Sequence, residues 1–410
     1  MLAVKRSGII AVAGRAAGLL LGLLLSGCGG GDDSSDSAAP YAEIKSKVAI
    51  SVATVPQADV TLLTHTMPAH AGGSTDATTL LFVPKGAAPP QGWPVVAWAH
   101  GTTTVAQKTC APSRTVDTLD GGLTAEGFPS HYSEVIGAWV TAGYAVVAPD
   151  FEGLGDAATG RYPYYSSDSE SRSLLSGVKA ARASNDALSR KWMAVGHSEG
   201  ARGVLALNSF VAEAPELDFR GTVAYAPYTS LIANFQYVNA LATSDPANAT
   251  LWTAIQNHFV AMFATAIDVD SPGLDQSQFM GADLAALMPT FRNGCVFAAF
   301  NQVYAAVAAK SPAAFAGSKA SWVDIPAVKT FFAKNDPAVL TGFKLAAPAF
   351  VAQGTADVFV PELLTTKLVN DLAGRGSSVS YRVYTGSDHG SIVLDAKADA
   401  LAFMAARFAN

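Results

Sequence analysis

The pentapeptide GHSEG at residues 196–200 constrains this chain more than any other feature. It has the pattern G-x-S-x-G, and the apolar run before it, 191–195, is suited to a buried strand. The run after it, 201–207, is suited to a helix. A strand, a sharp turn and a helix around this pattern predict a nucleophile elbow, which presents the Ser198 hydroxyl at the carboxyl end of a sheet. The alternative is a chance match in a chain rich in Gly, Ala and Ser.

A serine nucleophile needs a base, usually histidine, and a carboxylate that orients the base. In an α/β-hydrolase these residues follow in the order serine, acid, histidine. Only His258 and His389 come after Ser198 in the sequence. His258 lies in a segment that looks like an amphipathic helix, so we expect it on a helix surface. His389 follows a strand and lies in a Gly-rich loop, where the last loop of the sheet delivers the base.

The acid should come directly after the strand that precedes the strand leading to His389. The segment 349–354 is this strand, and Asp357 comes directly after it. Asp388 is a rival, but neighbouring residues on an extended loop point apart, so we expect Asp388 to cap the loop or the next helix. Glu362 is a weaker rival for the same reason of position. The sequence therefore predicts a triad of Ser198, Asp357 and His389.

Acyl transfer places negative charge on the substrate oxygen, and two backbone N–H groups usually stabilise it. One should belong to Glu199, directly after the nucleophile. The other should come from the loop after the early strand 94–99, which begins with His100 and Gly101. We predict Thr102 as this donor, with Thr103 as the alternative, and expect the histidine to hold the loop by hydrogen bonds.

Six short segments occur in an order that points to one family. They are HGTT at 100–103, CAPS at 110–113, APDFEGLG at 148–155, the elbow, QGTAD at 353–357 and GSDHG at 386–390. Together they resemble the secretory lipase family of α/β-hydrolases, known from fungi and bacteria and including the yeast lipase A type, over residues 80–405. The resemblance implies the triad roles above and hydrolysis of carboxylic esters, lipid-like or other.

The residue after the nucleophile departs from this family. Such lipases often carry Gln there, followed by a Gly-Gly pair, whereas this chain has Glu199 and then Gly-Ala-Arg. The change places a negative side chain near the predicted oxyanion site, unless Arg202, three residues further along the helix, pairs with it.

The N-terminus is typical of a targeting segment. Lys5 and Arg6 precede an apolar run at 16–25, and LSGC at 25–28 matches a bacterial lipoprotein box. We predict a signal peptide over 1–27, lipidation of Cys28, and a flexible tether over 28–40. This predicts an exported lipoprotein held at a membrane, by resemblance to diderm lipoproteins the outer one. The alternative is a cleaved signal peptide and a freely secreted protein.

The other cysteines and the charge exclude several classes of function. The chain has three cysteines, so lipidation would leave Cys110 and Cys295, which we expect to form a disulfide in an exported protein; two free thiols are the alternative. The net charge is −6 and only 15% of residues are charged, with no basic patch, so no nucleic-acid partner is expected. The histidines are scattered, and we expect no metal or cofactor.

Half of the residues are hydrophobic, enough for a large core. We predict an α/β-hydrolase core over 41–229 and 341–410, with a mostly parallel sheet and helices on both faces. A helix and early strands are expected in 41–93. The segment 230–340 reads as an inserted helical cap, with helices at 233–243, 248–267, 282–291, 296–309 and 326–334. Its large apolar residues would line an acyl pocket or form the core of the cap: Phe235, Trp252, Phe259, Met262, Phe263, Phe297, Phe300 and Trp322.

The sequence thus predicts a serine hydrolase that cleaves carboxylic esters through an acyl-enzyme. Its expected partners are an acyl ester or lipid substrate and a membrane. A peptidase or acyltransferase on the same triad is one alternative, because specificity depends on the cap and not on the motif. A binding lipoprotein that has lost catalysis is another.

Overall fold

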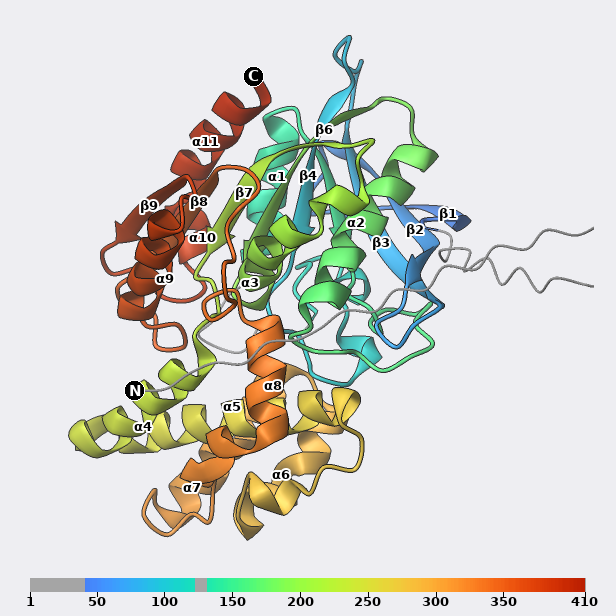
Figure 1. The fold of residues 1–410 in the computed structure, drawn as a ribbon. Coiled ribbons are helices and arrows are strands. Elements are labelled where there is room, and N and C mark those ends of the chain that lie inside the picture. Colours follow the sequence, from blue (N-terminus) through green and yellow to red (C-terminus); the bar gives the residue numbers. More distant parts are fainter. Residues whose placement is uncertain (1–40, 122–130, 410) are drawn as a thin grey trace, which may run out of the picture. The chain divides into compact units, whose positions relative to one another are not determined.

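The computed structural model describes residues 41–121 and 131–409, so the predicted signal peptide, Cys28 and the tether lie outside the described part. The described residues form a nine-stranded sheet in the order β1-β2-β3-β5-β4-β6-β7-β8-β9 (Figure 1). The strands are β1 (Ile44–Ile50), β2 (Ala58–Pro68), β3 (Ser74–Pro84), β4 (Trp93–Ala99), β5 (Ala145–Pro149), β6 (Leu188–His197), β7 (Asp218–Tyr225), β8 (Ala349–Gly354) and β9 (Val379–Tyr384).

The first part of the sheet is antiparallel and the rest is parallel. β1, β2, β3 and β5 pair antiparallel in succession, whereas all pairs from β5 across to β9 are parallel. The helix expected within 41–93 is wrong, because β1, β2 and β3 occupy this segment. Their Thr- and Val-rich sequences favour a pleated surface. β1 exposes most of its residues, including Lys45 and Lys47, which suits an edge strand.

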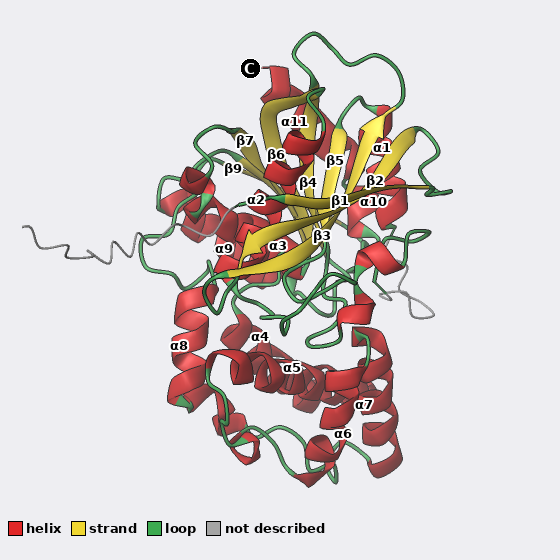
Figure 2. Cartoon of the chain, turned by 90° about the vertical axis from the view of Figure 1, so that its right-hand side faces the viewer, coloured by secondary structure: helices red, strands yellow, loops and turns green. Residues whose placement is uncertain are grey.

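Helices cover both faces of the sheet (Figure 2). The side chains of β4, which point alternately to the two faces, show why. Val95 and Ala97 enter one apolar cluster with residues of α2, α3 and α9, whereas Val96 and Trp98 enter another with residues of α1, α10 and α11. Successive side chains of a strand point to opposite faces, so a continuous apolar run suits a doubly covered strand. These helices are α1 (Tyr132–Thr141), α2 (Ser167–Ser184), α3 (Glu199–Ala206), α9 (Glu362–Gly374), α10 (Ile392–Asp395) and α11 (Lys397–Ala409).

Five further helices lie between β7 and β8 in the chain, one in each segment for which the sequence predicted a cap helix. We call them the cap: α4 (Leu231–Ser244), α5 (Ala249–Asp270), α6 (Ala282–Asn293), α7 (Val296–Lys310) and α8 (Pro326–Asn335). Helix α5 contacts α4, α6, α7 and α8, and every residue from 254 to 267 is buried. It is therefore the central helix of the cap.

Short 3-10 helices lie in the connections: η1 (Lys108–Cys110), η2 (Pro112–Arg114), η3 (Leu207–Ser209), η4 (Val211–Glu213), η5 (Pro246–Asn248), η6 (Gln276–Gln278) and η7 (Ala320–Asp324). The CAPS segment at 110–113 and the APDFEGLG segment at 148–155 meet at η2. The buried carboxylate of Asp150 accepts hydrogen bonds from the backbone N–H of Ser113, at 3.1 Å, and from its hydroxyl, at 2.5 Å. This contact fixes the loop after β4 against the end of β5.

The cap is tied to the loop after β4 by a disulfide and by two hydrogen bonds. Cys110 and Cys295 form the disulfide expected from the cysteine count. The N–H of Val296 donates to the carbonyl of Thr103 at 2.8 Å, and the hydroxyl of Thr104 donates to the carbonyl of Gly294 at 3.1 Å. The start of α7 is therefore fixed to the loop that carries the predicted oxyanion donor.

We expect the variant in which Cys110 and Cys295 are both replaced by Ser to lose about 2–5 kcal/mol of unfolding free energy. The disulfide closes a loop of 185 residues, and cross-links of long loops restrict the unfolded chain most. Urea denaturation of the oxidised protein measures the effect. Each single Cys→Ser variant serves as a control, because it breaks the same bond and should be destabilised as much as the double variant. Unchanged urea midpoints would contradict a stabilising disulfide.

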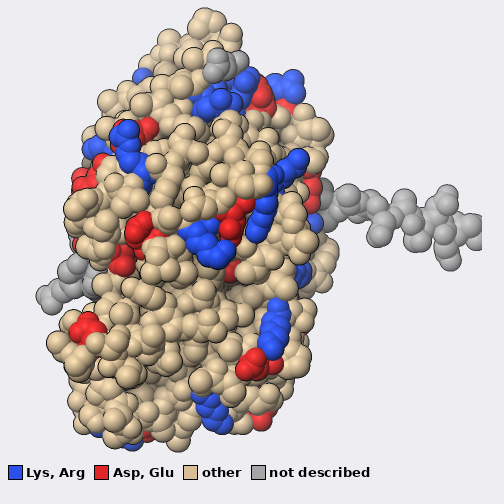
Figure 3. Space-filling model, turned by 60° about the vertical axis from the view of Figure 1, so that its left-hand side comes forward, with Lys and Arg blue, Asp and Glu red and all other residues tan. Residues whose placement is uncertain are grey.

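Charged side chains of both signs are interspersed on the face shown in Figure 3, and the lower part, formed by the cap, carries few of them. Ion pairs on the surface include Lys310 with Asp283 and Lys367 with Asp371. Over residues 41–121 and 131–409, no helix combines the length and the hydropathy that crossing a membrane requires.

Candidate active site

The predicted site residues all follow the carboxyl ends of parallel strands. Thr102 follows β4, Ser198 follows β6, Asp357 follows β8 and His389 follows β9. Parallel strands end at the same edge of a sheet, which is where open α/β sheets bind their ligands. The topology therefore brings together residues that are widely separated in the chain.

The elbow holds Ser198 in a strained backbone conformation, with φ 56° and ψ −118°. Such a conformation costs about 1–3 kcal/mol and persists only where the surroundings enforce it. Here the N–H of Ser198 donates to the carbonyl of Tyr225 at 2.9 Å. A Cβ on Gly196 would collide with the backbone of Gly200, and a Cβ on Gly200 would collide with the backbone of Ala99. The turn is thus possible only with glycine on both sides.

His389 connects the predicted nucleophile and the predicted acid. Its Nε2 lies 2.9 Å from the Oγ of Ser198, and its Nδ1 lies 2.7 Å from the Oδ2 of Asp357. The other oxygen of Asp357 accepts the N–H groups of Phe359, at 2.9 Å, and Val360, at 2.8 Å. Because a carboxylate can only accept, Nδ1 carries the proton and Nε2 is free to accept the serine proton.

The rival acids have other partners. The Oδ1 of Asp388 accepts the N–H groups of Gly390, at 2.9 Å, and Ser391, at 2.7 Å, so its carboxylate caps the loop before α10. Glu362 begins α9 and accepts the hydroxyl of Thr366 at 2.5 Å. The structure gives neither carboxylate a hydrogen bond with the ring of His389.

A chain of hydrogen bonds that sequence reasoning missed supports both sides of the site. The N–H of Gly101 donates to the hydroxyl of Tyr132 at 3.0 Å, and this hydroxyl lies 2.6 Å from Nδ1 of His197. The Nε2 of His197 lies 2.7 Å from the carbonyl of His389, so it donates and Nδ1 accepts. Burial, with the nearby His389, lowers the pKa of His197 well below its usual value, so the ring stays neutral. His197, the histidine within the G-x-S-x-G pattern, was the sequence signal that could have revealed this chain of hydrogen bonds.

The two predicted oxyanion donors border the nucleophile. Glu199 is the first residue of α3, where a backbone N–H has no acceptor within the helix. Thr102 lines the same pocket as Ser198, whereas Thr103 does not. A Cβ on Gly101 would lie 3.5 Å from the Cβ of Ser198, so the loop after β4 passes directly beside the nucleophile. This arrangement favours Thr102 over Thr103.

His100 has the structural position that the sequence suggested. It is buried, its Nδ1 lies 2.8 Å from the carbonyl of Gly101, and its ring packs on Phe151 with 4.2 Å between the ring centroids. Burial lowers the pKa of His100 to about 4, so the ring is neutral at physiological pH.

The side chain of Glu199 does not form an ion pair with Arg202, so the pairing considered from the sequence is corrected. Arg202 forms its ion pair with Glu170, while the carboxyl of Glu199 accepts the hydroxyl of Tyr162. All three charged side chains are fully buried. Burial raises the pKa of Glu199 to about 7 and raises the pKa of Glu170 well above its usual value. Two carboxyl groups that retain one proton balance one guanidinium, which avoids a net buried charge.

This cluster predicts how the Glu199→Gln variant depends on pH. Above about pH 7 the wild-type carboxyl ionises, since its pKa is about 7, and adds negative charge beside the predicted oxyanion. Gln cannot ionise, so the ratio of variant turnover to wild-type turnover should rise between about pH 6 and 9, while turnover near pH 6 stays within about threefold. Steady-state kinetics of both proteins across this range measures the ratio. A flat ratio would contradict ionisation of Glu199.

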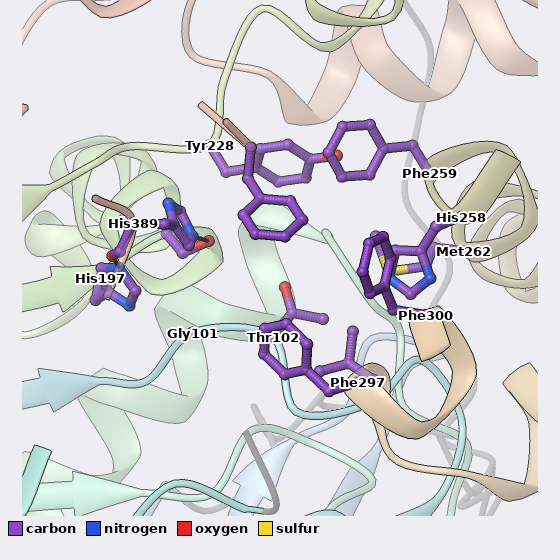
Figure 4. Close-up of a pocket in the computed structure, with 13 residues that line it drawn as sticks. Gly101, Thr102, His197, Tyr228, His258, Phe259, Met262, Phe297, Phe300 and His389 are labelled. Carbon is purple, nitrogen blue, oxygen red and sulfur yellow. Dashed lines mark hydrogen bonds between the residues drawn. The ribbon is translucent and has the colours of Figure 1, made fainter. Parts of the chain in front are cut away.

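An apolar pocket opens beside Ser198, between the sheet edge and the cap (Figure 4). It has a volume of about 60 Å³ and is lined by Gly101, Thr102, His197, Ser198, Tyr228, His258, Phe259, Met262, Val296, Phe297, Phe300, Phe359 and His389. Of the cap residues that the sequence singled out, Phe259, Met262, Phe297 and Phe300 line it. Phe235, Phe263 and Trp322 pack on one another in the cap core, so both sequence interpretations hold for part of the set.

His258 lines this pocket, so its expected place on a helix surface is wrong. Only 3% of the residue is exposed. The error has a physical cause: α5 is covered on all sides, and a helix buried all round has no apolar stripe that would reveal which side chains face inwards.

Among the described residues, no group of three or more His, Cys, Asp or Glu side chains is arranged to hold a metal ion.

Two comparisons relate this architecture to known proteins. A family model described as secretory lipase matches residues 132–410. No curated protein sequence matches this chain. Among solved structures, Candida antarctica lipase A in its closed state is similar, with a TM-score of 0.70 and 16% identity over 92% of this chain and 84% of that one.

Two bacterial structures are similar to the same extent. The rice cell wall degrading esterase LipA of Xanthomonas oryzae has a TM-score of 0.65 and 16% identity over 88% of this chain and 95% of that one. A putative hydrolase of Legionella pneumophila has a TM-score of 0.67 and 15% identity over 88% of this chain and 97% of that one. At these identities the likeness concerns the fold, and it confirms the predicted α/β-hydrolase architecture.

Proposed function

Because this chain belongs to the secretory lipase family, we propose that it hydrolyses carboxylic esters with Ser198 as the nucleophile. The observation that carries the proposal is the continuous hydrogen-bonded series from Ser198 through His389 to Asp357 at the wall of an apolar pocket. The lipase and esterase among the similar structures support ester hydrolysis as the reaction class.

In the first half-reaction the Oγ of Ser198 attacks the ester carbonyl carbon while Nε2 of His389 takes the hydroxyl proton. The carbonyl oxygen becomes an oxyanion, which the N–H groups of Glu199 and Thr102 stabilise. Asp357 stabilises the imidazolium through Nδ1. The C–O bond then breaks, His389 returns its proton to the departing alcohol, and the acyl group stays on Ser198.

In the second half-reaction a water molecule attacks the acyl-enzyme. Nε2 of His389 takes one proton from this water, a second oxyanion forms in the same place, and the bond to Ser198 breaks. The proton returns to Oγ, and the free acid leaves. No cofactor enters either half-reaction.

The pocket favours short substrates. Its volume of about 60 Å³ is small against the roughly 300–1,000 Å³ of typical ligand pockets. Its apolar wall suits a group of a few carbon atoms. A long straight chain would need additional space that this pocket does not provide.

A panel of p-nitrophenyl esters with acyl chains of increasing length tests the proposal. We expect kcat/KM to be highest for the short esters, and matched anilides to be hydrolysed far more slowly. Labelling with a fluorophosphonate probe should modify Ser198. An anilide preference would favour a peptidase, transfer to an added alcohol in place of water would favour an acyltransferase, and failure to label would favour a binding lipoprotein.

We also propose that Cys28 carries a lipid anchor, on the basis of the LSGC segment and the apolar run before it. Several acyl chains on one residue would give stable attachment, since each buried methylene contributes about 0.8 kcal/mol. The Cys28→Ser variant should leave the membrane fraction as a released protein or stay as an uncleaved precursor, with its esterase activity intact. Mass spectrometry of the native N-terminus decides: an unmodified N-terminal residue would indicate a freely secreted enzyme.

A further inference from the structure

The apolar pocket contains two polar side chains that the proposed reaction does not use. His258, from α5 of the cap, and Tyr228, from the loop after β7, both line it. Figure 4 shows Tyr228 reaching from the side of His389 towards Phe259, and His258 beside Met262 and Phe300 on the opposite side. The two residues therefore approach the pocket from the core and from the cap.

Both side chains are buried without the hydrogen bonds that burial normally requires. Tyr228 and His258 are each only 3% exposed, and neither the Tyr228 hydroxyl nor Nδ1 of His258 has a partner among the described residues. Burial alone lowers the pKa of His258 to about 3, with no hydrogen bond and no neighbouring charge contributing. A neutral imidazole can donate one hydrogen bond and accept another. Unpaired buried polar groups are rare in folded proteins, because each destabilises the fold.

The ring of His258 lies among aromatic side chains. Its ring packs against three aromatic rings, with 5.3 Å between its centroid and that of Phe291, 5.5 Å to Phe300 and 6.4 Å to Phe259. Tyr228 packs on Phe259 at 5.2 Å. An apolar side chain at either position would fit these surroundings without the loss of hydrogen bonds.

We propose that His258 and Tyr228 form a polar subsite that binds a hydroxyl or carbonyl oxygen of the substrate, a few atoms away from the ester carbonyl. The substrate class is a short carboxylic ester that carries one such oxygen in the part that enters the pocket. This inference rests on the proposed esterase function and makes it more specific. Binding the oxygen supplies the missing hydrogen bonds. A substrate without this oxygen leaves both side chains unpaired and should therefore have a lower kcat/KM.

Pairs of substrates that differ only by a methyl or a hydroxyl group test the subsite on either side of the ester. On the acyl side the pair is p-nitrophenyl 3-hydroxybutanoate and p-nitrophenyl 3-methylbutanoate. On the alcohol side it is 2-hydroxyethyl butanoate and propyl butanoate. We expect wild-type enzyme to prefer the hydroxyl member of one pair, and that pair identifies which part of the substrate occupies the pocket.

The variants His258→Leu and Tyr228→Phe remove the polar groups and keep apolar bulk. The preference of wild-type enzyme, measured as a ratio of kcat/KM values, should fall about five- to tenfold in each, the effect of losing one neutral hydrogen bond. His258→Gln should restore part of it. Met262→Leu is the matched control, since it changes the shape of the same pocket but not its polarity, and should leave the ratio within about twofold.

Thermal unfolding gives a second readout. Removing an unpaired polar group should leave the melting temperature of Tyr228→Phe unchanged or higher. A purely structural hydrogen bond would instead lower it. The subsite is wrong if both variants keep the wild-type ratio for both pairs. If none of the four esters is hydrolysed by any form of the enzyme, the esterase proposal itself fails, which is a separate result.

Discussion

Replacement of Ser198 by Ala should lower turnover of p-nitrophenyl esters by about 10⁴- to 10⁶-fold, because the acyl-enzyme can no longer form. The Oγ of Ser198 is the atom that Nε2 of His389 contacts at 2.9 Å, and it lies at the wall of the pocket. The remaining rate would come from the backbone donors and from binding. Single-turnover and steady-state assays on purified protein measure the loss.

The fold should survive this change, because Ala differs from Ser only in lacking the Oγ atom. A matched control is Ser209→Ala, which changes an exposed serine shortly after the elbow helix and should keep full activity. Circular dichroism verifies that both variants are folded. If Ser198→Ala retained more than about a tenth of wild-type turnover, the nucleophile would have to be another residue.

Replacement of Asp357 by Asn should lower turnover by about 10³- to 10⁴-fold, the next largest effect that we expect. The carboxylate accepts the Nδ1 proton of His389 at 2.7 Å. An amide nitrogen facing Nδ1 would favour the opposite tautomer, in which Nε2 carries the proton and cannot act as a base. The binding of substrate should change little, so the loss should appear in kcat rather than in KM.

Asp388→Asn is the matched control for this prediction. It makes the same chemical change on the residue next to His389, but on a carboxylate that accepts the N–H groups of Gly390 and Ser391 and not the imidazole. Its turnover should fall far less. If Asp388→Asn lowered turnover far more than Asp357→Asn, Asp388 would be the orienting acid, and the loop geometry derived from the sequence would be wrong.

Local sequence patterns were sufficient to predict much of the fold. The elbow was recognised because strain demands glycine at two flanking positions, and a strand and a helix are visible on either side. The cap helices were found because the segment between residues 230 and 340 is rich in Ala and lacks the alternation of strands. The order of serine, acid and histidine then restricted the search for partners to two histidines.

Features that depend on distant parts of the chain were not predictable in this way. The partner of Arg202 is Glu170, on a different helix, and no local rule selects it over the nearer Glu199. Tyr132 supports His197 from 65 residues away. The helix expected within 41–93 was wrong because strand pairing across β1, β2 and β3 decides that segment, and such pairing is not a local property.

If the chain is exported, as proposed, Cys110 has to pair with Cys295 and not with Cys28. Cys110 precedes Cys295 by 185 residues, so during the proposed export the only thiol ahead of Cys110 in the chain would be that of Cys28. Three cysteines allow three pairs, and thiolates exchange between them. A thioether on Cys28, as proposed, would act as a protecting group that blocks exchange at that sulfur. Lipidation would then secure fidelity of oxidative folding in addition to attachment.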